Sequence, residues 1–309
     1  MEIKKKIVIV TPAGRRAYLD LMKHYILGDA DIAEWHLWDN CRDPEDRIYI
    51  NSLADKYRKI KVIEIDLSDG TNLSVNKFYK FCNDPDVFYI KMDDDLVYLS
   101  PGLANILYQS ALIGKGDFAF WSPIVINNAI CSALLQSIGK ISTNVKLSSQ
   151  ASCPNGWGSP EFANKLHQEF LKLLKLNLSI TLDTTWNISL SRFSINCIGF
   201  WGADVLRLGV KFCPLDVDDE EWISAQSPSI INRMGKLVGA ACVSHYSFYT
   251  QEKFLNQTNI LDCYYEIAGL KRTFPLPKNK KNNIFLKRII EYFKRKYLTN
   301  KQKIDVKFI

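Results

Sequence analysis

The sequence lacks several features that would settle its class directly. It has no uninterrupted run of 18 apolar residues. The most apolar stretch of that length, residues 118–135, is interrupted by Pro123 and by the pair Asn127 and Asn128. A transmembrane helix is therefore not expected. Its eight cysteines form no C-x-x-C pair. There is neither a G-x-x-x-x-G-K-[S/T] phosphate loop nor a glycine-rich opening loop. A zinc site of paired cysteines and a P-loop nucleotide site therefore have no support.

The composition is that of an ordinary folded protein. Of 309 residues, 47% are hydrophobic and 24% charged, which suits one large domain or two small ones. A lysine-rich start leads directly into the apolar run Ile7–Val10. This run is too short for the apolar region of a signal peptide and predicts a first strand. We therefore expect a cytosolic protein whose scattered cysteines are mostly small buried residues.

Positive charge is concentrated after Pro275 and Pro277, which mark a boundary. Residues 278–309 contain 11 Lys/Arg and 2 Asp/Glu, a net of +9, so the total of +7 leaves −2 for residues 1–277. Apolar residues of this tail recur at helical spacing among basic ones: Leu286, Ile289, Ile290, Phe293 and Tyr297. The pattern predicts a basic amphipathic helix on the anionic inner face of a membrane. A helix docked on its own domain is the main alternative, and nucleic-acid binding is not expected.

Strand-like and helical patterns alternate over the first 100 residues. Apolar runs predict strands at 7–10, 34–39, 61–65 and 87–92, and helical spacing predicts helices at 17–26, 47–57 and 72–82. Such alternation is typical of a parallel sheet with crossover helices, whose ligands bind at the carboxyl ends of the strands. The later half is less regular, with strands predicted at 118–126 and 195–200. A helix is also predicted to begin with Ser159 as its N-cap and Pro160 in its first turn.

Three adjacent carboxylates follow the strand predicted at 87–92: Asp93, Asp94 and Asp95. Carboxylates at the end of a buried strand repel one another and are costly to desolvate, unless a cation is bound. Alternation along an extended chain places Asp93 and Asp95 on one side and Asp94 on the other. Two carboxylates on one side suit a hard divalent ion such as Mn²⁺ or Mg²⁺. An exposed acidic turn is the alternative interpretation.

This segment resembles the metal-binding Asp-x-Asp motif of nucleotide-sugar glycosyltransferases with the GT-A fold. The string Lys-Met-Asp-Asp-Asp-Leu-Val at 91–97 is similar to the corresponding segment of beta-1,3-galactosyltransferases and fringe proteins. Three later segments follow in the family's order, at 196–201, 217–222 and around His245. Residues 122–128 and 245–251 also look like a broad group of GT-A-like proteins. The resemblance covers about residues 5–270 and does not extend to galactosyl specificity.

The resemblance implies an α/β fold of GT-A type, with a central, mostly parallel sheet flanked by helices. Residues 1–277 would form the glycosyltransferase domain, in which 1–100 bind the nucleotide sugar and 101–277 the acceptor. The segment 278–309 would follow as the basic amphipathic tail. The expected enzyme is a metal-dependent glycosyltransferase of the hexosyltransferase class, using a nucleoside-diphosphate sugar, with UDP preferred. Its acceptor would be a hydroxyl of a glycan or lipid-linked molecule, in bacterial surface-polysaccharide assembly.

Roles for individual residues follow from the same resemblance. Asp93, Asp95 and His245 would bind the metal, with Mn²⁺ preferred over Mg²⁺ because imidazole is an unusual Mg²⁺ ligand. Asp219, with Asp218 second, would be the base that deprotonates the acceptor hydroxyl. A solvated acidic loop and a structural histidine are the alternatives for these segments. The motif H-x-x-G-x-x-K-P-W of one retaining group is absent, which favours inversion.

Further residues are candidates for donor binding because they lie at strand ends or near the acidic motif. The turn after the first strand presents Thr11 and Arg15 beside a helix N-terminus, where anions bind. Asp39 ends the second predicted strand, Lys77 lies 16 residues before Asp93, and Asp94 adjoins the metal ligands. The aromatic residues Trp157 and Trp201 suit core packing or stacking on an acceptor sugar.

Three other functions remain open from the sequence. The string Asp93-x-Asp95-x-Val97 also fits the nucleophile motif of haloacid-dehalogenase-type phosphatases, although that motif normally follows the first strand. A calcium-dependent sugar-binding module would use the same carboxylates only as ligands. A nucleotidyltransferase is the third alternative. A phosphatase would trap phosphate-mimicking fluorides on Asp93 and would release phosphate without an acceptor. Mn²⁺-dependent binding of a nucleoside diphosphate separates the transferase from the sugar-binding module.

Overall fold

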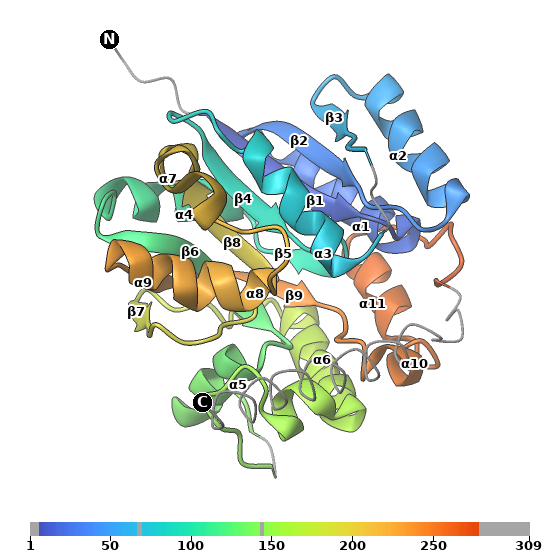
Figure 1. The fold of residues 1–309 in the computed structure, drawn as a ribbon. Coiled ribbons are helices and arrows are strands. Elements are labelled where there is room, and N and C mark those ends of the chain that lie inside the picture. Colours follow the sequence, from blue (N-terminus) through green and yellow to red (C-terminus); the bar gives the residue numbers. More distant parts are fainter. Residues whose placement is uncertain (1–5, 67–69, 143–144, 278–309) are drawn as a thin grey trace, which may run out of the picture. The chain divides into compact units, whose positions relative to one another are not determined.

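A computed structural model describes residues 6–66, 70–142 and 145–277 (Figure 1). Contacts within the chain separate a compact unit that ends at Pro275 from a second unit, Leu276–Ile309. The predicted basic helix falls in the second unit and outside the described residues. No helix in the described ranges is long and apolar enough to cross a membrane.

The described residues contain one mixed sheet of nine strands in the order β3-β2-β1-β4-β8-β6-β9-β5, with β7 paired to β9. The strands are β1 (Ile7–Ala13), β2 (Ile32–Asp39), β3 (Ile60–Ile63), β4 (Phe88–Met92), β5 (Leu96–Leu99), β6 (Phe118–Ile126), β7 (Thr185–Ile188), β8 (Cys197–Trp201) and β9 (Met234–His245). Helices flank this sheet, which confirms the α/β class expected from the sequence.

The described helices vary widely in length. The α-helices are α1 (Arg16–Gly28), α2 (Pro44–Lys56), α3 (Asn72–Val75), α4 (Leu103–Ile113), α5 (Ala129–Ser137), α6 (Pro160–Lys175), α7 (Gly202–Leu208), α8 (Asp219–Glu221), α9 (Ser227–Ile231), α10 (Glu252–Leu255) and α11 (Ile260–Ile267). Short 3₁₀-helices are η1 (Asn76–Phe81) and η3 (Gly209–Lys211), and single π-turns are η2 (Pro154–Gly158) and η4 (Trp222–Gln226).

The first half is the parallel part of the sheet. Strands β3, β2, β1 and β4 pair in parallel, and α1 and α2 are the crossovers that precede β2 and β3. The helices predicted at 17–26 and 47–57 are confirmed as α1 and α2. The α2 helix begins at Pro44, three residues before its predicted start, and the Asp43 side chain caps it by accepting from the Glu45 backbone N–H at 3.1 Å. Parallel pairing brings the carboxyl ends of β1 and β4 to the same edge.

The second half adds antiparallel strands that complete this edge. Strand β8 pairs antiparallel with β4, and β9 pairs antiparallel with β5 and parallel with β6. In the β5–β9 pair, Leu96 is opposite His245. The last residue of β9 therefore lies beside the carboxylates that precede β5, although about 150 residues of chain separate them.

Strand β4 lies in the core and carries the carboxylates to the edge. All five of its residues are buried, and the Phe88 ring contacts Trp121 and Trp201 at centroid distances of 6.0 and 5.2 Å. Packing on both faces fixes the direction of the strand, so the position of the residues that follow it is also fixed.

Some predicted elements differ from the structure in detail. The segment 72–82, predicted as one helix, is the short α3 followed by the 3₁₀-helix η1. Strand β5 was not predicted, because its apolar residues follow the carboxylates without a break. Strand β7 is mostly exposed and has no clear alternation of buried residues, so its pattern gives little signal.

Candidate metal and donor site

The sheet edge brings together the three residues that the sequence predicts as metal ligands. One oxygen each of Asp93 and Asp95 and one ring nitrogen of His245 all lie within 4.8 Å of one another. Asp93 and Asp95 follow β4, whereas His245 ends β9. Two carboxylates and one imidazole form a donor set that suits Mn²⁺.

Asp95 has an unsatisfied oxygen at the centre of this group. Its Oδ2 lies 3.1 Å from the Arg15 guanidinium and 3.4 Å from His245 Nε2. Its Oδ1 is buried and has no hydrogen-bond partner. A buried carboxylate oxygen without a partner is costly, and a bound cation removes that cost. The residues present therefore fit a metal ion.

The charge on Asp95 is stabilised by its neighbours. Burial alone would raise the pKa of Asp95, but the adjacent positive charges of Arg15 and His245 outweigh it and lower that pKa. Burial would likewise lower the pKa of His245, and the Asp95 carboxylate outweighs it and raises the pKa. The other ring nitrogen, Nδ1, lies 3.5 Å from the Asn127 carbonyl, which directs Nε2 towards Asp95.

Asp93 is oriented by a buried lysine and by the segment before β8. Lys91 pairs with Asp93 Oδ1 and also donates to the Ile195 carbonyl at 3.0 Å. Asn196 donates its side-chain amide to Asp93 Oδ2 at 3.1 Å and accepts from the Asp93 backbone N–H at 2.9 Å. Burial would lower the pKa of Lys91, but Asp93 and Asp219 outweigh it and raise that pKa. Lys91 is therefore a buried cation that stabilises this carboxylate.

Asp94 points to the other side, where the turn after β1 holds it. Its carboxylate accepts from the Gly14 backbone N–H at 3.0 Å and from Arg15 Nε at 2.9 Å. Arg15 thus contacts both Asp94 and Asp95, and its guanidinium lies 5.2 Å from the centre of the Tyr18 ring. The structure therefore places Arg15 and Asp94, two predicted donor-binding residues, directly beside the candidate metal ligands.

The formal charges of this cluster leave an excess of negative charge. Three aspartates are paired with Lys91, Arg15 and the imidazole of His245, which is a third cation when it is protonated. Asp219 adds a further carboxylate within electrostatic reach, because Lys91 and Asp93 both affect its pKa. A divalent cation would neutralise the excess, which is a second reason why the site fits a metal.

The acidic run at 218–221 contains two aspartates in different environments. The exposed Asp218 side chain caps α8 by accepting from the Glu221 N–H at 3.1 Å, and it pairs with Arg192 at 3.1 Å. Asp219 is half-buried, and Tyr79 donates its hydroxyl to it at 3.4 Å. Burial raises the pKa of Asp219, and Asp93 adds to this while Lys91 opposes it. Asp219 therefore has the properties that suit a general base.

Thr11 and Asp39, two other predicted donor residues, have structural partners. Thr11 is fully buried in β1 and accepts from Trp35 Nε1 at 2.9 Å. Asp39 is buried at the end of β2, where it pairs with Arg47 and accepts from the Cys41 N–H at 3.1 Å. In this conformation Thr11 has no accessible hydroxyl, and Asp39 would have to exchange a partner to bind a ribose.

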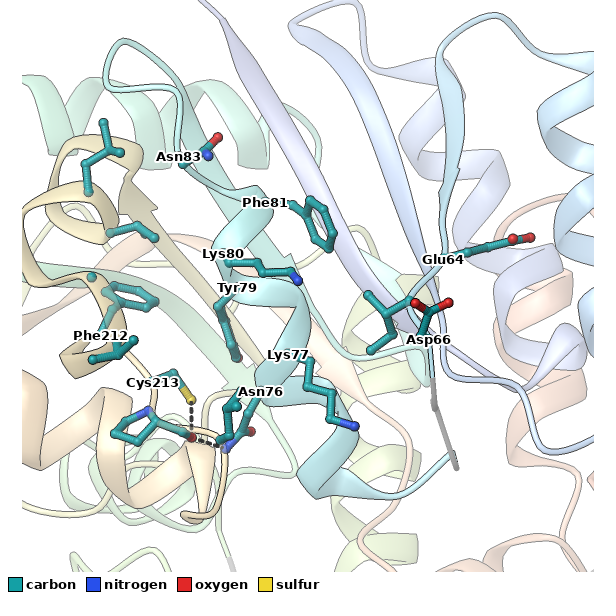
Figure 2. Close-up of a pocket in the computed structure, with 17 residues that line it drawn as sticks. Glu64, Asp66, Asn76, Lys77, Tyr79, Lys80, Phe81, Asn83, Phe212 and Cys213 are labelled. Atoms are coloured by element: carbon teal, nitrogen blue, oxygen red, sulfur yellow. Dashed lines mark hydrogen bonds between the residues drawn. The ribbon is translucent and has the colours of Figure 1, made fainter.

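Lys77 lines a pocket of about 810 Å³ between η1 and the segment 205–215 (Figure 2). Figure 2 shows Lys80 extending from η1 towards the side of the pocket where Asp66 lies. Tyr79, whose hydroxyl reaches Asp219, also lines this pocket. The Asn76 side chain donates to the carbonyls of Pro214 and Val217, which fixes the chain just before the acidic run.

Several residues that shape the site were not singled out from the sequence. Lys91 is the clearest case, because a lysine inside an otherwise apolar strand, two residues before a carboxylate, indicates a buried ion pair. Tyr79 and Arg192 give no comparable signal. They reach the acidic run from distant parts of the chain, 140 and 28 residues away from their partners.

The sequence matches no protein-family model and no curated protein. Among solved structures, the chain is similar to GalNAc-T7 crystallised with UDP, GalNAc and Mn²⁺, at 10% identity and a TM-score of 0.51. That match covers 86% of this chain and 47% of the other, so the chain spans about half its length. This likeness confirms the GT-A type of fold that the sequence predicts.

Two further similar structures have lower TM-scores. One is the mannosyltransferase PcManGT from Pyrobaculum calidifontis in complex with GDP-Man and Mn²⁺, at 11% identity and a TM-score of 0.46, covering 88% of this chain and 66% of the other. The other is TarS 1-349 of S. aureus, at 13% identity and a TM-score of 0.44, covering 85% of this chain and 71% of the other.

Proposed function

We propose that this chain is a metal-dependent glycosyltransferase that uses a nucleoside-diphosphate sugar. The observation that carries the proposal is the convergence of Asp93, Asp95 and His245 at the carboxyl edge of a GT-A-type sheet, with one buried Asp95 oxygen unpartnered. UDP is the preferred nucleotide, in line with the UDP and Mn²⁺ present in the similar GalNAc-T7 structure.

The metal would be held by Asp93, Asp95 and His245, with Mn²⁺ preferred and Mg²⁺ second. A bound divalent cation supplies stabilisation of the negative charge that develops on the diphosphate leaving group. Arg15 keeps Asp94 and Asp95 in position and has 30% of its side chain exposed at the site, so it also suits a diphosphate oxygen. Lys77 would bind a phosphate, and Asp39 the ribose or base.

Asp219 would accept the proton of the acceptor hydroxyl as that oxygen attacks the anomeric carbon, in an inverting reaction. Its raised pKa increases its basicity, and Tyr79 orients the carboxylate. Asp218 is less suitable because it caps α8 and pairs with Arg192. The proton therefore ends on Asp219, and the leaving diphosphate departs on the opposite face of the sugar.

The acceptor would be a glycan or a lipid-linked molecule, bound by residues 101–277. With the predicted tail at 278–309, the enzyme would be peripheral on the inner face of a membrane and would serve polysaccharide synthesis. Nucleic acid is not a proposed partner. The phosphatase alternative is weaker because its nucleophile motif normally follows the first strand, whereas Asp93 follows β4, the fourth strand along the chain.

A pair of variants separates metal binding from catalysis. Asp95→Asn should remove Mn²⁺-dependent binding of UDP, because it neutralises the carboxylate that carries the unpartnered oxygen. Asp219→Asn should retain that binding and lower glycosyl transfer by about 10²–10⁴-fold. Calorimetry with UDP, GDP and CMP, with and without Mn²⁺, measures binding, and release of nucleotide from the sugar donor measures turnover. Equal transfer by Asp219→Asn and wild type would assign the base elsewhere.

A further inference from the structure

We propose that Trp157, Phe248 and Tyr249 form an aromatic platform that binds a pyranose ring of the acceptor saccharide. This inference rests on the proposed glycosyltransferase function and names one surface of its acceptor site. The platform combines two segments that are distant in sequence, the π-turn η2 before α6 and the loop between β9 and α10. Both segments belong to the half of the chain expected to bind the acceptor.

The platform adjoins the candidate metal site directly. The Phe248 ring lies 4.7 Å from the His245 ring, measured between centroids. Trp157 lies 6.2 Å from Phe248 and 5.2 Å from Tyr249, in an edge-to-face arrangement with the latter. Tyr249 is 63% exposed, and Trp157 and Phe248 are half-buried. Aromatic surface thus extends from the metal ligand His245 to the outside of the molecule.

One buried amide holds both segments of the platform. Gln251 is fully buried and donates to the carbonyls of Gly156 at 3.3 Å and Trp157 at 3.0 Å. Its oxygen accepts from the Phe248 backbone N–H at 3.1 Å and from the Asn127 side chain at 2.9 Å. All four hydrogen-bonding positions of this amide are used, so its orientation is fixed. The backbone that carries Trp157 and Phe248 is therefore positioned before any ligand binds, which lowers the cost of binding.

The same network connects the platform to His245. Asn127 uses its side chain to bind Gln251 and the Tyr246 carbonyl, while its own carbonyl faces His245 Nδ1. Asn127 has a φ of 65°, a left-handed conformation that asparagine tolerates better than most residues. A ligand stacked on Trp157 or Tyr249 is thereby kept at a fixed distance from the candidate metal.

The chemistry of these rings suits a sugar. Tyrosine and tryptophan combine an apolar face with a polar edge, and the face of a pyranose ring carries C–H groups flanked by hydroxyls. Large exposed aromatics beside a polar site are informative, because such surface is normally buried. The donor-binding candidates Arg15, Asp39 and Lys77 come from the first half of the chain, which leaves this surface for the acceptor.

The test compares Tyr249→Ala and Trp157→Ala with the conservative Tyr249→Phe in the full-length protein. Phe81→Ala is the matched control, because Phe81 is an exposed aromatic, 37% accessible, that lines the pocket of Lys77 and does not belong to the platform. Saturation-transfer NMR with methyl glycosides of glucose, galactose, mannose and the two N-acetylhexosamines identifies a ligand and its affinity. Calorimetry with UDP and Mn²⁺ measures donor binding in the same variants.

Both alanine variants should weaken glycoside binding by about three- to tenfold while UDP binding stays unchanged. Tyr249→Phe and Phe81→Ala should bind glycosides as the wild type does. Equal glycoside affinity in all variants, no glycoside binding by the wild type, or weaker binding only in Phe81→Ala would overturn the platform. Weaker UDP binding in Tyr249→Ala would assign the rings to the nucleotide instead. If the wild type shows no Mn²⁺-dependent UDP binding, the proposed function is refuted. The platform is then still decided by the glycoside measurements, through the outcomes given above.

Discussion

Asp218 and Asp219 are adjacent in the sequence, yet their surroundings differ. Asp218 is exposed, and its carboxylate is engaged by the Glu221 backbone N–H and by Arg192. Asp219 is half-buried beside Tyr79, and its pKa is raised by burial and by neighbouring carboxylates. At the scale of single residues, burial therefore favours the same candidate base, Asp219, that the family resemblance implies.

The pH dependence of turnover tests this selection. A base must be ionised, so activity should fall as the pH decreases through the pKa of Asp219, which is above the ordinary carboxyl value. Asp218→Asn removes a negative charge that raises the pKa of Asp219, so the acidic limb of kcat/KM should move to lower pH. Asparagine caps helices as well as aspartate does, so α8 should be retained. A pH–rate profile measures the shift, and a collapse of activity at every pH would identify Asp218 as the base.

The sequence predicts much of the site at this scale, for identifiable reasons. The ligand types and the alternation of Asp93, Asp94 and Asp95 follow from local pattern, and the structure brings Asp93 and Asp95 together with His245. The contact of Arg15 with Asp94 and Asp95 was not predictable, because it depends on the pairing of β1 with β4. The burial of Thr11 beside Trp35 depends in the same way on the pairing of β1 with β2.

At the scale of elements, close packing of β8 against β4 determines where the carboxylates lie. A Cβ on Gly199 would come within 2.3 Å of the Phe88 ring, and a Cβ on Gly202 within 2.0 Å of the Asp84 carbonyl oxygen. Gly202 also donates its backbone N–H to the Val87 carbonyl at 3.0 Å. Glycine at the junction of β8 and α7 therefore lets the chain approach the start of β4.

Gly202→Ala should consequently destabilise the fold. The added methyl group would overlap a backbone carbonyl, which cannot move aside as a side chain can, so a loss of about 1–3 kcal/mol is expected in the free energy of unfolding. Gly28→Ala is the matched control, because its Cβ would meet no atom within 4 Å at the end of α1. Urea unfolding of both variants measures the difference. Equal stability would show that β8 can shift away from β4 at no cost.

The elements also show which parts of the fold the sequence determines locally. Helices α1, α2 and α6 and strands β1, β2, β4 and β6 were predicted, because they combine clear periodicity with caps or β-branched runs. Strand β5 was missed, although it sets the register that places Leu96 opposite His245. Such a register depends on pairing between distant segments, which a local pattern does not contain.

At the scale of the whole molecule, charge is divided between two parts of the chain. Residues 278–309 carry +9 against −2 for the remainder, so a negatively charged surface would attract this tail and not the rest of the protein. The tail lies outside the described residues. The spacing of its apolar and basic residues is the feature that favours binding to a membrane surface.

A charge-matched pair of variants tests the tail in the full-length protein. Replacing Lys287, Arg288, Lys294 and Arg295 by Gln should weaken binding to phosphatidylserine vesicles at least tenfold, because each basic residue near such a surface contributes about 1 kcal/mol. The control replaces four exposed lysines of the body by Gln and so changes the net charge equally: Lys56, Lys172, Lys175 and Lys253. Vesicle sedimentation at low and physiological salt measures binding. Equal losses in the two variants would mean that net charge, and not the tail, determines membrane association; no loss in either would refute a membrane role for the basic segment.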